Sequence, residues 1–514
     1  MQDDRSTSVR RVQAALHRLR TRLCASRWHA PLLSNELRLC TGLEHLISRA
    51  LARVRLGVLF PYSFALLLRP LTRRTGLRAP ENNLTPMTFG SVSDSSIFHR
   101  WTRARRVPVL TTNAGTHELP FQHWRRFKEA FTPELVAHAI ADSPIKVRRC
   151  IDPFGGSGTT ALTCQFLGIH PITAEVNPYL ADLIESKLSQ YDRYELQKDL
   201  FRVTSAAESR VGRPHRRFKN APATFVEPGV EGRWVFDMRV AERIDALLGA
   251  IERLRSVSSR RLFRVIAGGI LVRFSNVLTS GKGRRYRARW KESPRDPSIV
   301  VRSFLGRAQR VIAEVSLHSR RPCRTYDLIR GDARSDLAGC HGELVVTSPP
   351  YPNSFDYTDV YNLELWTLGY LRGKASNVRL RQATLSSHVQ LYRDFGSPPD
   401  GSARLRKLIR ALQMQRHALW NPWIPEMIGA YFQDLCSVLD SLFEAMSRKA
   451  TVWIVVGDSQ YASVTVRTSS ILAELARART WSVRRETAVR NMRSSAQQGG
   501  SRRLAENLLV LQRR

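Results

Sequence analysis

Apolar and polar positions between residues 133 and 190 follow the order of an alternating α/β fold. The pattern predicts a helix at residues 133–140, a strand at 148–151, a helix at 160–167, a strand at 171–175 and a helix from 178 to about 190. Thr132 and Pro133 suit the cap and first turn of the first helix. A strand, a glycine-rich turn, a helix, a second strand and a second helix are how a doubly wound sheet opens.

The alternation is then interrupted and resumes later in the chain. Residues 191–320 contain helical patterns and two strongly basic stretches, without a strand–helix–strand order. Strands are expected at residues 326–332, 343–347, 451–456 and 507–511, with a mainly helical stretch at 361–447. The sequence therefore predicts an α/β protein with a Rossmann-like, doubly wound, mostly parallel sheet and helical insertions.

This pattern divides the chain into four parts. They are an N-terminal extension (1–85), the first part of the α/β domain (86–190), a basic and mainly helical insertion (191–320), and the second part of the domain (321–514) with a helical insert at 371–447. The extension is either an accessory helical arm or a segment without a stable fold, and residues 86–116 read as loop. The longest apolar run, residues 56–68, contains Pro61 and is shorter than the roughly 20 residues of a membrane span, so no membrane or secretory segment is expected.

The net charge of the chain indicates which class of partner it binds. Lys and Arg number 81 against 44 Asp and Glu, a formal net charge of +37. Such a balance favours phosphate backbones and indicates DNA or RNA, although a generally arginine-rich proteome would raise it too. The seven cysteines include no CxxC pair, so we expect no metal site and a reducing, cytoplasmic compartment.

The first chemical motif is DPFGGSGTT, residues 152–160, which follows a predicted strand and opens a helix. Glycines let the backbone turn tightly and approach a ligand, and the helix start offers free N–H groups. No Lys follows the last glycine, which excludes a P-loop. Glu175 ends the next strand at about the spacing where such folds place a carboxylate for ribose hydroxyls, although a solvated strand-end Glu would look the same.

The second motif is the strand end TSPPY, residues 347–351. Two prolines fix the backbone and keep Ser348 extended, so that carbonyl oxygens can accept hydrogen bonds from an amino group. Tyr351 offers a flat face on which a nucleobase could stack. Alone, the motif could also be an ordinary rigid turn.

Together, the two motifs resemble the signatures of the amino-group DNA methyltransferases, whose fold is the class I S-adenosylmethionine-dependent methyltransferase fold. In that family TSPPY is the form associated with cytosine N4, whereas Asp or Asn at the Ser position is commoner for adenine N6. The resemblance covers residues 120–190 and 325–514 in patches. Its other stretches are 131–140, 331–333, 355–357, 361–366, 453–459 and 506–511.

The resemblance implies a role for each motif residue. The cofactor S-adenosyl-L-methionine would be bound by Asp152, Phe154, Gly156, Gly158, Thr159, Glu175 and Asp332, with Glu175 on the ribose and Asp332 on the adenine. Ser348 and the carbonyl of Pro349 or Pro350 would hold the target amino group, and Tyr351 would stack on the flipped base. Transfer would be direct, without a covalent enzyme intermediate. Pro322–Cys323, the only Pro–Cys pair, is interpreted as a core or loop cysteine.

The DNA-recognition region is harder to place. Many cytosine-N4 enzymes have the two motifs in the opposite order, so analogy does not locate it. Our leading candidate is residues 280–291, where basic and aromatic residues alternate: Lys282, Arg284, Arg285, Tyr286, Arg287, Arg289 and Trp290. The alternatives are that this is a solvated basic loop, and that recognition uses the helical block 405–419 instead. The basic run 210–219 is interpreted as a flexible phosphate-contacting linker.

The expected function is therefore site-specific methylation of cytosine N4 in double-stranded DNA by base flipping. The setting would be restriction–modification or phage defence in the cytoplasm of a bacterium or archaeon, with a cognate restriction endonuclease as a further partner. Adenine-N6 methylation and a non-catalytic nucleic-acid-binding protein that keeps the fold are the alternatives. RNA and protein-glutamine methyltransferases fit less well, because those relatives usually have Asn or Asp before the two prolines.

Overall fold

The computed structural model describes residues 96–493 and 503–514, apart from positions 114, 126, 128, 129, 281 and 282. The chain divides into two compact units, Met1–Asn82 and Asn83–Arg514, and all described residues belong to the second. The N-terminal extension expected at residues 1–85, with its apolar run at 56–68, lies outside the described residues.

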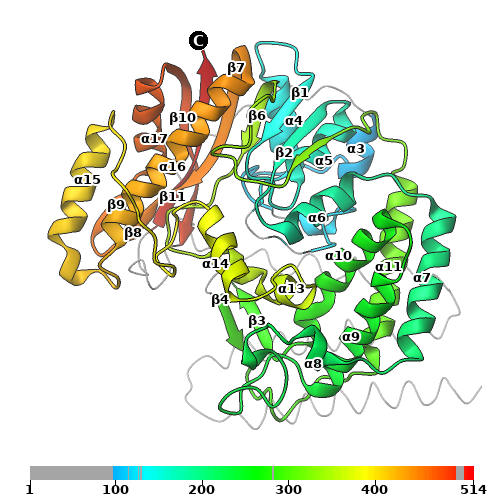
Figure 1. Ribbon diagram of the computed structural model, residues 1–514. Coiled ribbons are helices and arrows are strands. Elements are labelled where there is room, and N and C mark those ends of the chain that lie inside the picture. The colour runs from blue at the N-terminus through cyan, green and yellow to red at the C-terminus, as the bar shows by residue number, and fades with distance from the viewer. Residues whose placement is uncertain (1–95, 114, 126, 128–129, 281–282, 494–502) are drawn as a thin grey trace, which may run out of the picture. The chain divides into compact units, whose positions relative to one another are not determined.

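A seven-stranded sheet forms the centre of this unit (Figure 1). Its strands, in spatial order, are β10 (Trp481–Arg493), β11 (Arg503–Arg513), β7 (Met446–Gly457), β6 (Gly342–Thr347), β1 (Arg149–Asp152), β2 (His170–Ala174) and β5 (Asp327–Ile329). Neighbours from β7 to β5 pair in parallel, and β11 pairs antiparallel with both β7 and β10. The predicted Rossmann-like, mostly parallel α/β fold is confirmed.

Helices cover the sheet and build the insertions. They are α3 (Ser96–Thr102), α4 (Pro133–Ala141), α5 (Thr159–Leu167), α6 (Pro178–Leu188), α7 (Arg193–Glu208), α8 (Pro214–Arg217), α9 (Met238–Glu252), α10 (Val257–Phe274), α11 (Ile299–Leu317), α12 (Tyr357–Val360), α13 (Asn362–Thr367), α14 (Lys374–Ala383), α15 (Ala403–Met414), α16 (Ile424–Ala445) and α17 (Thr468–Ala478). Two short hairpins, β3 (Val277–Ser280) with β4 (Gly283–Tyr286) and β8 (Ser459–Tyr461) with β9 (Val464–Val466), lie outside the main sheet.

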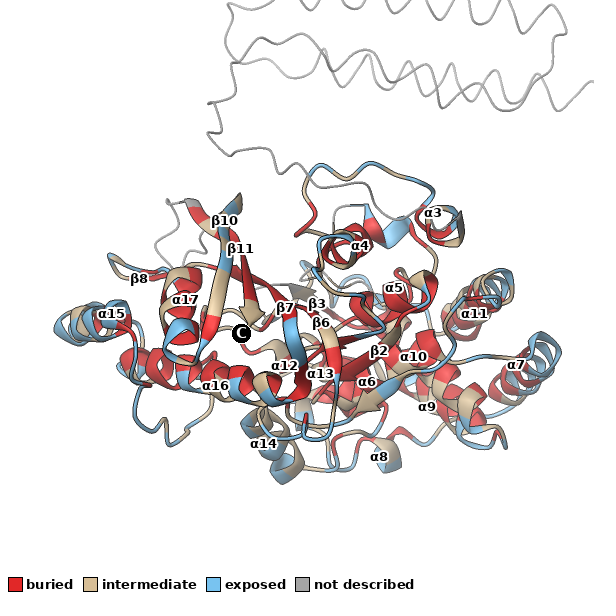
Figure 2. Cartoon of the chain, turned by 90° about the horizontal axis from the view of Figure 1, so that it is seen from above, coloured by how far each residue is buried: buried red, intermediate tan, exposed pale blue. Residues whose placement is uncertain are grey.

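Side chains alternate between the two faces of the sheet, and both faces are buried under helices (Figure 2). Val345 and Ile454 pack with α16 and α17 on one face. Their neighbours Leu344 and Trp453 pack with α4 and α5 on the other. Successive residues of a strand point to opposite faces, so strands covered on both sides are apolar throughout. This accounts for the clear strand signal at residues 343–347 and 451–456.

The insertion between β2 and β5 is mainly helical, and its helices α7, α9, α10 and α11 share a core with α6 and α13. The β3–β4 hairpin was not predicted, because each strand has only four residues and β4 is largely basic. The basic run 210–219 is not a free linker. It contains α8, and Arg217 forms ion pairs with Asp245 and Glu252.

Four other expectations differ from the structure. The expected loop at 86–116 contains α3, and the helix expected to reach 190 ends at Leu188. Of the strand expected at 326–332, only residues 327–329 form a strand, β5. The sequence did not predict β10. Strand β10 lies at the sheet edge and is rich in Arg, and charged residues on an edge strand hide the apolar alternation that marks a strand. In the described part of the chain, no helix is long and apolar enough to cross a lipid bilayer.

A buried ion pair joins the segment before α4 to α13. Arg125 Nε lies 2.8 Å from Glu364 Oε1, and the Glu364 side chain is completely buried. The guanidinium also lies over the ring of Tyr361, 5.3 Å from its centroid. A buried charge without its counterion is very costly, so the two segments are held together by this pair.

We predict that Glu364→Ala lowers the free energy of unfolding by about 3–5 kcal/mol, because it leaves the Arg125 guanidinium buried without its counterion. Urea unfolding followed by circular dichroism measures the change. Glu195→Ala, which removes the exposed partner of Lys198, is the control and should change stability by less than about 0.5 kcal/mol. Equal effects of the two substitutions would contradict the importance of the buried pair.

Candidate active site

The two motif loops leave neighbouring strands at the same edge of the sheet. Strand β1 pairs in parallel with β6, with Ile151 opposite Val345. The chain continues from β1 to β2 on one side and β6 lies on the other, so this is the switch point where open α/β sheets bind ligands. The Thr347 hydroxyl donates to Asp152 Oδ1 at 2.8 Å, and the Thr160 hydroxyl donates to the Val346 carbonyl at 3.1 Å. These bonds join loops that are nearly two hundred residues apart in the sequence.

A cavity of about 360 Å³ opens between the two loops. This volume is within the range of about 300–1,000 Å³ that is typical of small-molecule sites. Of the predicted site residues, the cavity is lined by Asp152, Phe154, Gly156, Thr159, Glu175, Asp332, Ser348, Pro349, Pro350 and Tyr351. Gly158 lies at the start of α5 and shapes the turn instead of lining the cavity.

The glycine loop needs its glycines and is fixed by Glu175. Gly156 and Gly158 have φ values of 52° and 77°, and a Cβ on Gly156 would lie 3.0 Å from the Phe127 ring. Glu175 accepts hydrogen bonds from the backbone N–H groups of Gly156 at 2.7 Å and Asn177 at 2.8 Å. One carboxylate therefore links the glycine turn to the start of α6.

The two carboxyl groups under the glycine loop are deeply buried. Burial raises the pKa of Asp152 to about 6, although hydrogen bonds from Thr347 and the Phe154 N–H lower it. Burial raises the pKa of Glu175 to about 7, and the charge of Asp152 adds to this rise. Raised carboxyl pKa values inside a cavity are typical of binding and catalytic sites.

Two tyrosines that lie outside both motifs, and that were not predicted, hold the proline loop from behind. The buried Tyr431 of α16 donates its hydroxyl to the Pro350 carbonyl at 2.9 Å. The buried Tyr461 of β8 donates to the Pro352 carbonyl at 3.0 Å. Neither residue has a local sequence signal, because each is a single tyrosine among core positions. The Pro350 carbonyl, one of the two candidates for holding an amino group, therefore already accepts one hydrogen bond.

The ring of Tyr351 is fixed at both ends. It packs on Gly457, where a Cβ would come within 2.6 Å of the ring, and its hydroxyl donates to Glu506 Oε1 at 3.0 Å. Arg490 from β10 forms two hydrogen bonds with Glu506, at 2.5 and 2.8 Å. Burial, together with the charge of Glu506, raises the pKa of Tyr351 well above its usual value. The ring therefore lines the cavity as a neutral, immobilised phenol.

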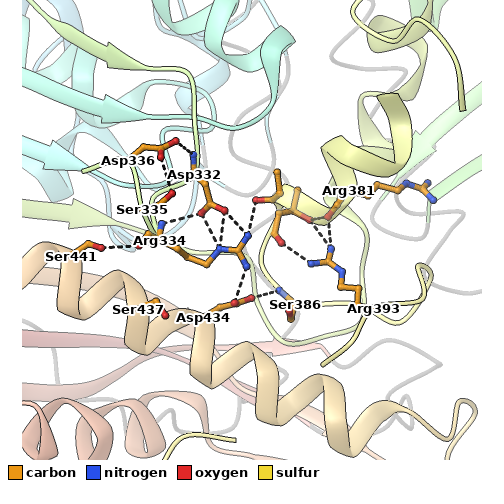
Figure 3. Close-up of polar contacts among 12 residues, drawn as sticks. Asp332, Arg334, Ser335, Asp336, Arg381, Ser386, Arg393, Asp434, Ser437 and Ser441 are labelled. Atoms are coloured by element: carbon orange, nitrogen blue, oxygen red, sulfur yellow. Dashed lines mark hydrogen bonds and ion pairs between the residues drawn. The ribbon is translucent and has the colours of Figure 1, made fainter. Parts of the chain in front are cut away.

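Asp332 lines the cavity but is already part of an ionic network (Figure 3). Arg334 donates hydrogen bonds from Nε and Nη2 to the Asp332 carboxylate, and from Nη1 to Asp434 at 2.8 Å. Asp434 in turn accepts from the Ser386 N–H at 2.7 Å. A ligand that bonds to Asp332 would share the carboxylate with Arg334. The network also fixes the segment around Ser386 that forms the cavity wall.

The candidate DNA-binding residues lie on and after the β3–β4 hairpin, while Lys282 is outside the described residues. Arg284, Arg285 and Arg289 are exposed. Arg287 instead donates to the carbonyls of Ser275 and Val272. The rings of Tyr286 and Trp290 stack on each other at 5.2 Å, and Trp290 meets Trp234 edge-on at 4.8 Å.

The hairpin is also close to the cavity. Strand β4 contacts α12, and Tyr357 and Thr358 of α12 line the cavity. The exposed arginines are thus grouped near the site, whereas the two aromatic rings are used in internal packing. Among the described residues, no cluster of three or more His, Cys, Asp or Glu side chains could hold a metal ion.

Several known methyltransferases share sequence with this chain. The Type II methyltransferase M.AvaI of Nostoc sp. is 25% identical over 389 residues, covering 70% of this chain and 78% of that protein. M.BsoBI of Geobacillus stearothermophilus is 24% identical over 390 residues, covering 66% and 74%. M.MjaII of Methanocaldococcus jannaschii is 36% identical over 74 residues, 14% of each chain. The first two similarities extend far beyond the motif loops.

Other similarities are weak. No family model matches the chain. The rRNA methyltransferase AviRa of Streptomyces viridochromogenes, a solved structure, covers 74% of this chain at 11% identity with a TM-score of 0.26, too low a likeness to support an argument.

We predict that the stability contributed by Glu175 falls as the pH rises from about 5 to 8. In the folded protein its pKa is about 7, above the unfolded value, so the folded state binds the extra proton at low pH and loses this advantage as the group ionises. Glu175→Gln does not titrate at this position. Relative to it, the free energy of unfolding of the wild type should fall by up to about 3 kcal/mol over this range. Urea unfolding of both proteins at several pH values measures it, and a constant or rising difference would show that the pKa is not raised.

Proposed function

We propose that this chain is an S-adenosylmethionine-dependent DNA methyltransferase that transfers a methyl group to the N4 amino group of cytosine, extruded from double-stranded DNA. The observation that carries the proposal is the cavity lined on one side by the glycine loop and on the other by Ser348–Tyr351. Similarity to Type II methyltransferases supports the enzyme class. We place the activity in restriction–modification or phage defence, in the cytoplasm of a bacterium or archaeon, beside a cognate endonuclease.

The donor half of the cavity fits the cofactor chemically. Two buried carboxyl groups, Asp152 and Glu175, face it with raised pKa values, so a cationic ligand with hydroxyl groups would be favoured there. When bound, S-adenosylmethionine supplies a methyl group on a positively charged sulfur. We assign the contacts of its methionine part to Asp152, Phe154, Gly156 and Thr159, those of its ribose to Glu175 and those of its adenine to Asp332. Gly158 supports these contacts by shaping the turn.

The acceptor half is built to hold an amino group. The Pro350 carbonyl already accepts the hydroxyl of Tyr431, so we assign the two hydrogen bonds from the amino group to the Ser348 hydroxyl and the Pro349 carbonyl. These acceptors orient the nitrogen towards the glycine loop while the Tyr351 ring supports the flat base. Positioning and exclusion of water then supply most of the rate acceleration, without a covalent bond to the enzyme.

The product test separates the candidate reactions. The full-length protein is incubated with S-adenosylmethionine and unmethylated duplex DNA, and the DNA is digested to nucleosides for mass spectrometry. We expect N4-methylcytosine. N6-methyladenine as the sole product would overturn the base assignment. Absence of any methylated nucleoside from a protein that binds DNA but not the cofactor would favour a non-catalytic binding protein.

We predict that Tyr351→Ala lowers kcat/KM for DNA about 10- to 100-fold, because a base–aromatic stack contributes roughly 1–3 kcal/mol. Cofactor affinity, measured by calorimetry, should stay within a few-fold. Tyr351→Phe is the matched control: it keeps the ring on Gly457 and removes only the hydroxyl, with its bonds to Glu506 and Ser348, so most activity should remain. Loss of cofactor binding in Tyr351→Ala would show that the ring serves the donor half instead.

A further inference from the structure

Three large apolar side chains, Met414, Trp420 and Trp423, are exposed between the end of α15 and the start of α16, and the exposed Tyr392, which precedes α15, contacts Trp423. Tyr392 and Met414 are each 81% exposed, Trp423 is 49% exposed and Trp420 is 46% exposed. The rings of Tyr392 and Trp423 meet nearly perpendicularly, with centroids 6.4 Å apart. Grouped exposed rings of this size usually mark a binding surface. We call these four residues the aromatic corner.

The aromatic corner is tied to the proline loop from two directions. Two residues shortly before Tyr392 bond to Ser354, three positions after Tyr351: the Val389 N–H donates to its hydroxyl at 3.3 Å, and the Gln390 amide donates to its carbonyl at 2.7 Å. From the other side, Ser463 of the β8–β9 turn donates to Gln415, just after α15, at 2.9 Å.

The second tether ends on the same loop. Tyr461, in the β8 strand of that hairpin, donates to the Pro352 carbonyl. Both ends of the aromatic corner are therefore connected to the segment that immediately follows Tyr351. None of the four corner residues lines the cavity itself, but the segments that carry them are hydrogen-bonded to the loop that forms its acceptor half.

Helix α15 adds a basic surface to this corner. Leu405, Leu408 and Leu412 are buried, whereas Arg406, Lys407 and Arg410 are exposed on the opposite side of the helix. Residues 401–425 contain five Lys or Arg residues and His417, but no Asp or Glu. A surface that combines exposed cations with exposed rings suits a polyanion that also presents flat apolar groups.

We infer that the aromatic corner and the basic face of α15 bind the DNA duplex next to the extruded base. This inference rests on the proposed function. The cations contact phosphates, and the rings fill space beside the base pairs that the extruded base has left. The β3–β4 hairpin is less suited to the second task, because Tyr286 and Trp290 already stack on each other.

The rings are tested with Tyr392→Ala/Trp423→Ala in the full-length protein. Fluorescence anisotropy with a labelled duplex should show at least about ten-fold weaker binding, with the KM for DNA raised in parallel, because each stacked ring contributes roughly 1–3 kcal/mol. Thermal unfolding and cofactor affinity should stay unchanged. The matched control is Tyr194→Ala/Phe201→Ala on α7, whose rings are 70% and 72% exposed at the opposite end of the molecule from α15 (Figure 1).

The cations are tested through the salt dependence of binding. Arg406→Ala/Lys407→Ala/Arg410→Ala should lower the slope of log Kd against log salt by about one for each phosphate that the variant no longer neutralises. The matched control is Lys146→Ala/Arg148→Ala/Arg448→Ala. These three residues are exposed near the amino ends of β1 and β7, at the sheet edge opposite the cavity, and should leave the slope unchanged.

The outcomes distinguish this inference from the proposed function. Wild-type protein that neither binds nor methylates duplex DNA would overturn the proposed function, and the inference with it. Wild-type activity together with corner variants that behave like their controls would overturn the inference alone. Light scattering after gel filtration provides the remaining test: a changed oligomeric state with unchanged duplex affinity would identify the corner as a contact between two copies of the chain and refute the DNA assignment.

Discussion

The parallel pairing of β1 with β6 is the constraint on which the site depends. These strands are adjacent only because the chain places β2 and β5 on one side of β1 and returns for β6 on the other. Both loops must then leave at one sheet edge, and the bond from Thr347 to Asp152 fixes their separation. This topology therefore places a cavity between two chemically different loops that are far apart in the sequence.

Two buried carboxyl groups line the cavity, although burial disfavours their ionised forms. Asp152 and Glu175 have raised pKa values because burial disfavours their ionised forms, and hydrogen bonds from Thr347 and from backbone N–H groups offset only part of that cost. Glu175 also has a structural task, since it connects the glycine turn to α6. A ligand that carries positive charge would relieve the unfavourable part of this arrangement, so stability and ligand binding are coupled in the same carboxyl groups.

The acceptor loop is rigid for a different reason. Its prolines fix the local backbone, but Tyr431, Tyr461 and the Arg490–Glu506 pair fix where that backbone and the Tyr351 ring lie in space. The aromatic corner is attached to the same loop on its outer side. Contacts with a duplex at the corner and contacts with a base in the cavity would therefore share one rigid support, which is how precise positioning of a reacting group is achieved.

The sequence alone determined the central strands of the sheet, because strands buried on both faces are apolar throughout, and it determined both motif loops, because tight turns and fixed backbones require glycine and proline. Ten of the residues that the sequence singled out line the cavity, and Gly158 instead shapes the turn beside it. It could not identify β10, an edge strand rich in Arg, or the single tyrosines and the Glu506 side chain that brace Tyr351. The sequence also did not decide whether residues 280–291 or the helical block 405–419 recognise DNA. Tertiary structure alone decided that the rings of Tyr286 and Trp290 are packed while those of Tyr392 and Trp423 are exposed, because exposure depends on which distant residues cover a side chain.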